Sequence, residues 1–247
     1  MENIQLDNTY LVAKSTLPIL LSIIKERLDE NPNEKMENWI TILEDWEKTW
    51  NYEYNGSLIA PTFFEEWINN IRERTWSDDL ENIIWPEINI LENLIVNNPN
   101  SKWFDIKNTP NEKEVLKDIC NTSFDNTIKK ISGKLKTELE WQNYRGTDIL
   151  HIIGIPQFSS LGLKTSGAEN IINATRKNEG PSWRYIIEMS QPYKILGIYP
   201  GGQSGYPGSF YYDNFIPDWV SGKYKNLIFP NDNNEFEGTE LKCIPKH

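Results

Sequence analysis

Residues 200–215, PGGQSGYPGSFYYDNF, gather glycines and polar side chains of the types that could perform catalysis. The tetrapeptide GQSG around Ser204 comes close to the Gly-x-Ser-x-Gly turn that presents a catalytic serine, although its second glycine is one residue early. Such a serine needs a general base, and His151 is the one histidine that does not end the chain. A Ser204–His151 pair would make the chain a serine hydrolase. Because His151 lies in the apolar segment DILHIIGIP, the sequence favours a half-buried structural histidine instead.

The sequence supports phosphate binding, dinucleotide binding and catalysis by paired carboxylates less than it supports a catalytic serine. A phosphate-binding loop needs a Lys after its glycines, and none follows here. A dinucleotide-binding loop needs a different glycine spacing and a helix, which Pro207 would interrupt. Pairs of carboxylates, as in glycosidases, can be drawn freely among 36 Asp and Glu residues, so they decide nothing. The carboxylates closest to the glycine-rich stretch are expected to be exposed or to bind backbone: Glu179, Glu188 and Asp213.

The composition is that of an acidic globular protein. A length of 247 residues suggests one large domain or two small ones. The net charge of −11 argues against a nucleic-acid partner, which would require a basic face. No apolar run reaches about 18 residues, so no membrane span is predicted, and the first residues, MENIQLDN, do not resemble a signal peptide. Cys120 and Cys243 allow at most one disulfide, and the few Cys and His residues predict no metal site.

The first half of the chain has the 3.6-residue periodicity of amphipathic helices. Apolar residues at this spacing predict helices over residues 16–28, 39–50 and 64–71. A fourth helix is predicted to begin at Pro110, with Thr109 as its N-cap and Glu112 completing a capping box, and to continue to Leu135. The charged residues between these apolar stripes are expected to face solvent.

The second half has weaker periodicity and more glycine, proline and aromatic residues. Strands are predicted over WRYIIEM (183–189), YKILGIYP (193–200) and GTELKCI (238–244), and a short helix within FIPDWVSGKY, ending near Gly222. Helices followed by strands favour an α+β fold, or part of a larger one. We expect a mainly helical region over residues 1–140 and a strand-rich region over residues 141–247.

The ten Trp residues permit an alternative function. Most of them stand beside apolar segments, which favours packing in the core. Trp is rarely buried completely, however, so some are expected to line grooves. A stand-alone module that binds glycans or peptides through exposed Trp and Tyr side chains therefore remains a second hypothesis.

Seven residues of the second half form the candidate site, as a ligand groove or as a structural motif. Gly180-Pro181 forms a turn into a strand, where a serine can bind backbone and an arginine brings a cation into an acidic chain. The polar residues of GQSG lie among glycines that allow another backbone to approach closely. We expect a loop tied to the rest of the protein. The seven residues are Ser182, Trp183, Arg184, Gln203, Ser204, Tyr212 and Asp213.

These phrases resemble, in their order, the C-terminal end of the β-chain in the penicillin amidase (penicillin acylase) family. The likeness rests on GPSWR (180–184), on GQSG with Pro207 and Ser209, on the Tyr-Asp at 212–213, and on the pattern Trp-x-x-Gly-x-Tyr over residues 219–224. It extends upstream through GAENIINA, SKWFDIKNTP, TFFEEWI and the first twenty residues, and so covers nearly the whole chain. Two positions depart from the family pattern: Glu179 replaces a His, and Gln142 replaces a frequent Gly.

The resemblance implies an N-terminal-nucleophile hydrolase with an αββα core, to which the strands of this chain would contribute. In such enzymes the Ser that begins the β-chain attacks an amide carbonyl, its own α-amine acts as base, and backbone and Asn groups bind the oxyanion. The Ser, the oxyanion Asn and the calcium ligands of the family have no counterpart between Met1 and His247. We therefore expect no catalytic residue, metal ligand or cofactor in this chain, and no activity of the chain alone.

The resemblance also implies the partners and the compartment. The partner is the N-terminal part of the same enzyme, which comprises the α-chain and the start of the β-chain. The complete enzyme would act on a small acyl amide, in the periplasm or outside the cell. A chain without this partner would expose apolar sheet edges, so we expect it to associate or to be poorly soluble when it is made alone.

Overall fold

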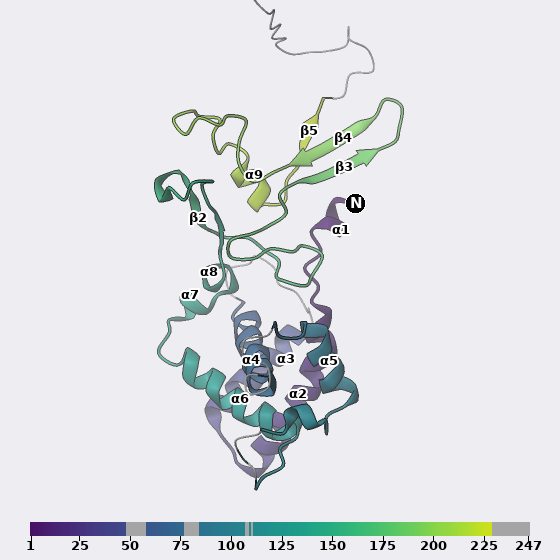
Figure 1. Ribbon diagram of the computed structural model, residues 1–247, viewed down its shortest axis with the longest axis vertical. Coiled ribbons are helices and arrows are strands. Elements are labelled where there is room, and N and C mark those ends of the chain that lie inside the picture. Colours follow the sequence, from purple (N-terminus) through teal and green to yellow (C-terminus); the bar gives the residue numbers. More distant parts are fainter. Residues whose placement is uncertain (48–57, 77–83, 107–108, 110, 229–247) are drawn as a thin grey trace, which may run out of the picture. The chain divides into compact units, whose positions relative to one another are not determined.

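The computed structural model describes residues 1–47, 58–76, 84–106, 109 and 111–228 of the chain (Figure 1). These residues form two compact units. One unit runs from Leu6 to Gly180, and the other joins Met1–Gln5 to the residues from Pro181 onward.

Helices form most of the unit Leu6–Gly180 (Figure 1). Its two short strands pair antiparallel with each other. The helices are α2 (Leu11–Glu30), α3 (Glu34–Glu47), α4 (Ala60–Trp76), α5 (Ile88–Asn97), α6 (Leu116–Ile131), α7 (Lys136–Leu139) and α8 (Trp141–Tyr144), with the 3-10 turns η1 (Lys102–Phe104) and η2 (Pro156–Phe158) and the strands β1 (Thr147–Ile149) and β2 (Ser160–Leu163).

The three helices predicted from apolar periodicity are present as α2, α3 and α4. In each of them the core buries most of the periodic apolar residues, such as Leu17 of α2, Leu43 of α3 and Trp67 of α4, while Leu28 and Trp39 are half-buried against it. Trp50, the last residue of the predicted second stripe, lies outside the described residues. The pattern predicts these helices because one continuous face of each contacts the core.

The predicted start of the fourth helix is wrong: Pro110 itself lies outside the described residues, but residues 111–115 are not helical. Helix α6 begins at Leu116, and the Asp118 carboxylate accepts a hydrogen bond from the Val115 N–H at 3.0 Å. The Thr109 hydroxyl instead donates to the Glu114 carboxylate at 2.6 Å, so the side chain expected to cap the helix binds within the preceding loop. The helix also ends before Leu135, which is exposed and precedes α7.

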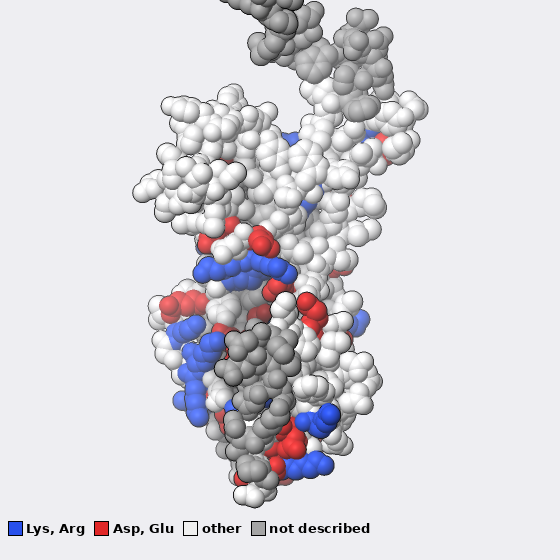
Figure 2. All heavy atoms as spheres, in the orientation of Figure 1, with Lys and Arg blue, Asp and Glu red and all other residues white. Residues whose placement is uncertain are grey.

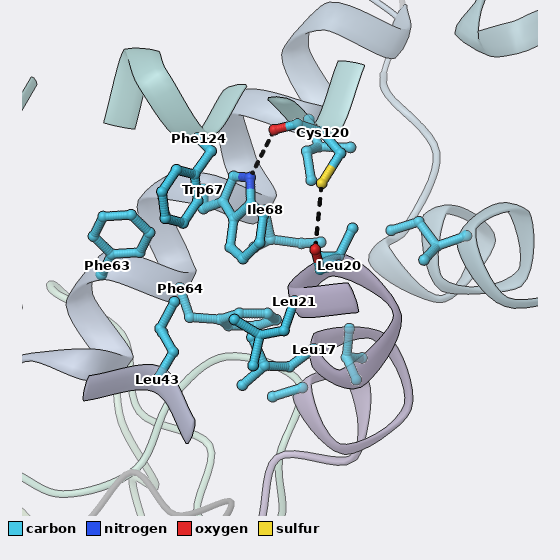
Figure 3. Packing of buried hydrophobic residues seen from close by; sticks show 14 of the residues in the cluster. Leu17, Leu20, Leu21, Leu43, Phe63, Phe64, Trp67, Ile68, Cys120 and Phe124 are labelled. Atoms are coloured by element: carbon cyan, nitrogen blue, oxygen red, sulfur yellow. Dashed lines mark hydrogen bonds between the residues drawn. The ribbon is translucent and has the colours of Figure 1, made fainter. Parts of the chain in front are cut away.

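The core of this unit gathers side chains from α2, α3, α4, α5 and α6, and Figure 3 shows the part where residues of α2, α3, α4 and α6 pack together. The Trp67 and Phe124 rings pack edge to face with their centroids 4.8 Å apart. The Trp67 indole N–H donates to the Cys120 carbonyl at 3.2 Å, and the Cys120 thiol lies 3.8 Å from the Leu20 carbonyl oxygen. Burial raises the pKa of the Cys120 thiol well above its ordinary value, because a thiolate would lose its hydration there.

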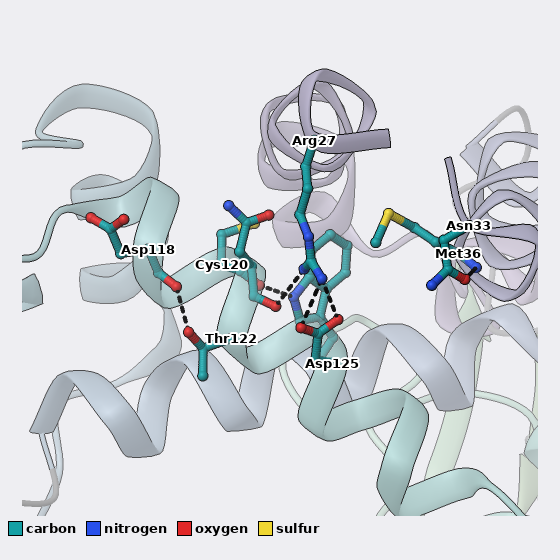
Figure 4. Close-up of polar contacts among 9 residues, drawn as sticks. Arg27, Asn33, Met36, Asp118, Cys120, Thr122 and Asp125 are labelled. Atoms are coloured by element: carbon teal, nitrogen blue, oxygen red, sulfur yellow. Dashed lines mark hydrogen bonds and ion pairs between the residues drawn. The ribbon is translucent and has the colours of Figure 1, made fainter. Parts of the chain in front are cut away.

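An ion pair at the rim of the core also joins α2 to α6 (Figure 4). One guanidinium nitrogen of Arg27 lies 3.0 and 2.9 Å from the two carboxylate oxygens of Asp125. The other terminal nitrogen lies 3.4 Å from the Asn121 carbonyl oxygen. These contacts add directional bonds to an otherwise apolar helix–helix interface.

The second unit is built around a three-stranded antiparallel sheet with the order β3-β4-β5. The predicted strands 183–189 and 193–200 are present as β3 (Arg184–Glu188) and β4 (Lys194–Ile198), and the predicted short helix is α9 (Ile216–Val220). Gly222 follows α9 with a φ of 70°, in the left-handed region that favours glycine. The sequence did not predict β5 (Lys225–Leu227) or the short α1 (Glu2–Gln5), and the segment 238–244 lies outside the described residues.

The α+β fold class is confirmed, since helices fill the first half and antiparallel strands follow. The change from helices to strands falls between α8 and β1, near residue 145, whereas the two compact units divide at Gly180–Pro181. Among the described residues no helix combines the length and the apolar character needed to cross a membrane.

Candidate functional site

The GPSWR segment (180–184) and α9 bind each other through reciprocal side-chain contacts. The Arg184 guanidinium donates to the Trp219 carbonyl at 3.0 Å and lies over the Trp219 ring, 5.4 Å from its centroid. In return, the Trp219 indole N–H donates to the Pro181 carbonyl at 2.9 Å. Both side chains are buried, and these contacts of Arg184 and Trp219 hold the start of β3 against α9.

The pKa of Arg184 reflects its burial against α9. Burial lowers the pKa of the Arg184 guanidinium, because removal from water disfavours the charged form. Burial also raises the pKa of the Tyr224 hydroxyl, which donates to the Gln5 side-chain oxygen at 2.6 Å. The Gln5 amide donates in turn to the Tyr185 carbonyl at 3.0 Å, which ties the N-terminal residues to β3.

The stretch 200–215 is closed by hydrogen bonds among its own residues. The Ser204 N–H donates to the Tyr211 carbonyl at 3.0 Å, and the Ser204 hydroxyl accepts from the Tyr206 N–H at 3.1 Å. The side chains of Gln203 and Asn214 bind each other through an amide contact of 3.2 Å, and the Asn214 oxygen also accepts from the Gln203 N–H. Asn214 is a partner that the sequence reasoning missed.

Gly202 allows the two ends of this loop to approach. A side chain on Gly202 would collide with the carbonyl oxygens of Tyr211 and Tyr212 at distances that no real Cβ tolerates. The Gly202 carbonyl accepts a hydrogen bond from the Tyr199 hydroxyl at 2.9 Å, and the Phe215 N–H donates to the Gly201 carbonyl at 2.9 Å. The glycines therefore serve close backbone packing at this point.

Of the remaining members of the predicted set, Tyr212 is half-buried and the other three lie at the surface. Ser182 and Asp213 are exposed, and the Asp213 carbonyl accepts from the Ile216 N–H at the start of α9. Trp183 is half-exposed and stacks on Tyr199 with centroids 5.5 Å apart and an interplanar angle of 7°. The unit thus brings Arg184 to Trp219 and Gln203 to Asn214, while Trp183 faces solvent.

His151 and Glu179 have local partners. The His151 Nδ1 accepts a hydrogen bond from the Ile153 N–H at 3.4 Å, and its ring packs against Phe158. The Glu179 carboxylate pairs with Arg176 at 3.5 Å. Within the described residues, no group of three or more His, Cys, Asp or Glu side chains is placed to hold a metal ion.

Two phrases that the sequence reasoning treated separately meet in the helical unit. Asn173 of GAENIINA is buried, its side chain donates to the Asn8 side-chain oxygen at 2.9 Å, and its N–H donates to the Asp7 carbonyl at 3.0 Å. The Gly167 carbonyl at the start of this phrase accepts from the Trp141 indole at 3.0 Å and from Arg145 at 3.1 Å. This buried polar network holds the segment that leads to Gly180.

Comparison with known proteins identifies the family. The family model for penicillin amidase matches residues 1–235. No curated protein sequence matches significantly. Among solved structures, the chain is similar to a thermostable penicillin G acylase from Alcaligenes faecalis, with a TM-score of 0.53 at 12% identity, which shows a shared fold. The match covers 97% of this chain and 48% of that one, so this chain spans about half the length of the acylase chain. The chain belongs to the penicillin amidase family.

Proposed function

We propose that this chain is the C-terminal portion of the β-chain of a penicillin-amidase-type acylase, which hydrolyses linear amide C–N bonds. The nucleophilic Ser, the oxyanion Asn and the calcium ligands belong to another part of the enzyme, made of the α-chain and the start of the β-chain. The 247 residues alone are inactive. The complete enzyme acts on small acyl amides in the periplasm or outside the cell.

The observation that carries this proposal is the family match over residues 1–235 in a chain that covers 48% of a similar acylase chain. Local geometry supports it. The Ser204 hydroxyl binds the Tyr206 N–H and the His151 Nδ1 binds the Ile153 N–H, so each has a local structural partner. Under this proposal the seven predicted site residues belong to the wall around the substrate groove, and Arg184, Gln203 and Ser204 hold β3, α9 and the loop 200–215 in place.

The proposal is tested by assaying phenylacetyl and aliphatic acyl anilides with two preparations. One is the 247-residue chain alone, and the other is the chain expressed together with the polypeptide that the adjoining upstream DNA encodes. We expect turnover only in the second preparation. The matched variant Ser204→Ala should retain that turnover, because Ser204 is not the nucleophile.

Two results would contradict the proposal. Turnover by the chain alone that disappears in Ser204→Ala would restore the serine-hydrolase hypothesis. Absence of turnover for every anilide with the second preparation would contradict the amidase function itself.

A second candidate function is glycan or peptide binding, which the exposed aromatic side chains favour. Trp183 is 49% exposed, Tyr206 is 70% exposed and Phe210 is 83% exposed. Such rings can stack on sugars or on peptide side chains. Titration of the Trp fluorescence with a panel of glycans and peptides tests this function, and an unchanged emission across the panel would remove it.

A further inference from the structure

One face of the sheet β3-β4-β5 is apolar and open to solvent. The register pairs Tyr185 with Gly197, Ile187 with Ile195, and Ile195 with Leu227. Because side chains alternate between the two faces of a strand, these residues lie on one face. A side chain on Gly197 would meet the Leu227 side chain, which confirms that Leu227 lies over β4.

The side chains of this face are unusually accessible for their type. Tyr185 is 54% exposed, Ile187 is 47% exposed and Leu227 is 36% exposed, and Trp183 continues the row just before β3. Since an aromatic side chain can bury about 150–250 Å², Trp183 and Tyr185 alone leave roughly 200 Å² in contact with water. A contiguous apolar area of several hundred Å² typically marks an interaction site.

Charge is almost absent from this face. Among the described residues of the three strands, Lys225 is the one charged residue that the register places on it. Its ammonium lies 2.5 Å from the Asp218 carboxylate and over the Phe215 ring, so it is already neutralised within the unit. In Figure 2 the atoms of this unit are mostly white on the face shown, whereas charged side chains gather over the helical unit.

The opposite face of the same sheet has a covering segment from this chain. Met1, and Glu2 at the start of α1, line a cavity of about 370 Å³ together with Ile186, Ile187 and Leu196. The alternation places Ile186 and Leu196 on that face. The Gln5 hydrogen bond to the Tyr185 carbonyl holds the same segment near β3. The two faces therefore differ, and the face of Tyr185, Ile187, Ile195 and Leu227, extended by Trp183, is called the open face below.

We propose that the open face is the docking surface for the remaining part of the acylase, whose contact layer is apolar and carries no unpaired charge. The inference rests on the proposed function. The similar acylase chain continues for about as many residues again as this chain matches, because 97% of this chain covers only 48% of that one. A sheet in a globular fold packs its apolar face against another layer, and half of the similar fold remains to supply that layer.

The experiment uses the tagged 247-residue chain expressed with the polypeptide that the adjoining upstream DNA encodes. The double variant Tyr185→Lys/Ile187→Lys places two charges on the open face. The control Ile152→Lys/Ile153→Lys places two charges on a turn of the helical unit, where the side chains are 95% and 73% exposed. We expect the open-face variant to recover at least ten-fold less partner, and the control to recover as much as the unaltered chain.

A second measurement does not depend on the folding of a variant. Hydroxyl-radical oxidation of Trp183 and Tyr185 in the unaltered chain should fall several-fold when the partner is present. Ile152, modified in the same samples, serves as the internal reference. Light scattering of the chain alone shows whether a second copy covers the open face instead.

Four outcomes would overturn the inference: equal partner recovery by the open-face variant, unchanged oxidation of Trp183 and Tyr185, no partner recovery by the unaltered chain, and a homodimer that the open-face variant abolishes. Anilide turnover is measured on the same samples, which separates the two proposals. Docking through the open face without turnover contradicts the acylase function alone. Turnover with the open face still oxidised contradicts the docking surface alone.

Discussion

At the scale of single residues, the side chains that first suggest chemistry bind backbone. Ser204 accepts from the Tyr206 N–H, and Arg184 donates to the Trp219 carbonyl. Glu114 likewise accepts hydrogen bonds from the Thr109 hydroxyl and the Ile106 N–H, which closes the loop before α6. Polar residues among glycines satisfy backbone groups that tight turns would otherwise leave unpaired.

Gly202→Ala should destabilise the second unit, because the new methyl group would collide with the Tyr211 and Tyr212 carbonyl oxygens. We expect a loss of about 1–3 kcal/mol in the free energy of unfolding, as for other overpacked sites. Gly205→Ala is the control in the same loop, since its Cβ would meet nothing within 4 Å. Urea denaturation followed by Trp fluorescence measures both. Equal stability of the two variants would refute the close approach at Gly202.

Glu114→Gln should reduce the pH dependence of stability. The Thr109 hydroxyl bond lowers the pKa of the Glu114 carboxylate. A carboxylate with a lowered pKa in the folded state stabilises the protein above its unfolded pKa, and this contribution is lost as the pH falls through the folded value. The stability difference between the unaltered protein and Glu114→Gln should therefore shrink on acidification from pH ~6 to pH ~3.

Urea titrations at several pH values in this range provide the measurement. Glu112→Gln changes an exposed carboxylate of the same loop and serves as the control. A difference between Glu114→Gln and the unaltered protein that stays constant over the whole range would show that Glu114 has no pH-linked role.

At the scale of elements, apolar stripes determine where the interiors of helices α2, α4 and α6 lie, while polar contacts determine where a helix begins, as at α6. The interiors of the predicted helices were confirmed because burial follows a 3.6-residue period. The predicted start of α6 was wrong because Thr109 and Glu112 match a capping pattern in the sequence although they do not cap a helix. In the structure these residues stay in a loop, because Glu114 forms hydrogen bonds with Asp105, Ile106 and Thr109.

Trp67→Phe should weaken the contact between α4 and α6. The substitution removes the hydrogen bond to the Cys120 carbonyl and leaves a small cavity beside Phe124 (Figure 3). We expect a loss of about 1–3 kcal/mol in the free energy of unfolding. Trp103→Phe is the control, since Trp103 is 37% exposed and should change stability by less than about 0.5 kcal/mol. Thermal and urea melts compare the two, and similar losses would contradict the packing argument.

At the scale of the whole molecule, apolar burial is unequally distributed between the two units. The unit Leu6–Gly180 holds a large continuous core. The described part of the other unit buries three apolar side chains below the surface: Ile198, Ile216 and Trp219. Its open sheet face adds exposed apolar area, which agrees with the proposed docking surface.

The two units of the isolated chain should therefore open at different free energies. Hydrogen exchange read by mass spectrometry across a urea series should show the amides of β3 and β4 opening more than about 1 kcal/mol more easily than those of α4 and α6. Gly202→Ala should lower only the first value. Identical opening free energies in both units would mean that the chain unfolds as one cooperative body.

The sequence by itself determined α2, α3, α4 and the interior of α6, the two main strands, the α+β class and the family. These properties depend on local periodicity and on short ordered phrases, which residues close in the chain encode. Only the tertiary structure decided that Arg184 binds Trp219, that Asn173 binds Asn8, and that the sheet has one covered and one open face. Each of these depends on a partner far away in the chain, and the energy of a buried polar group is settled by the partner that packing places beside it.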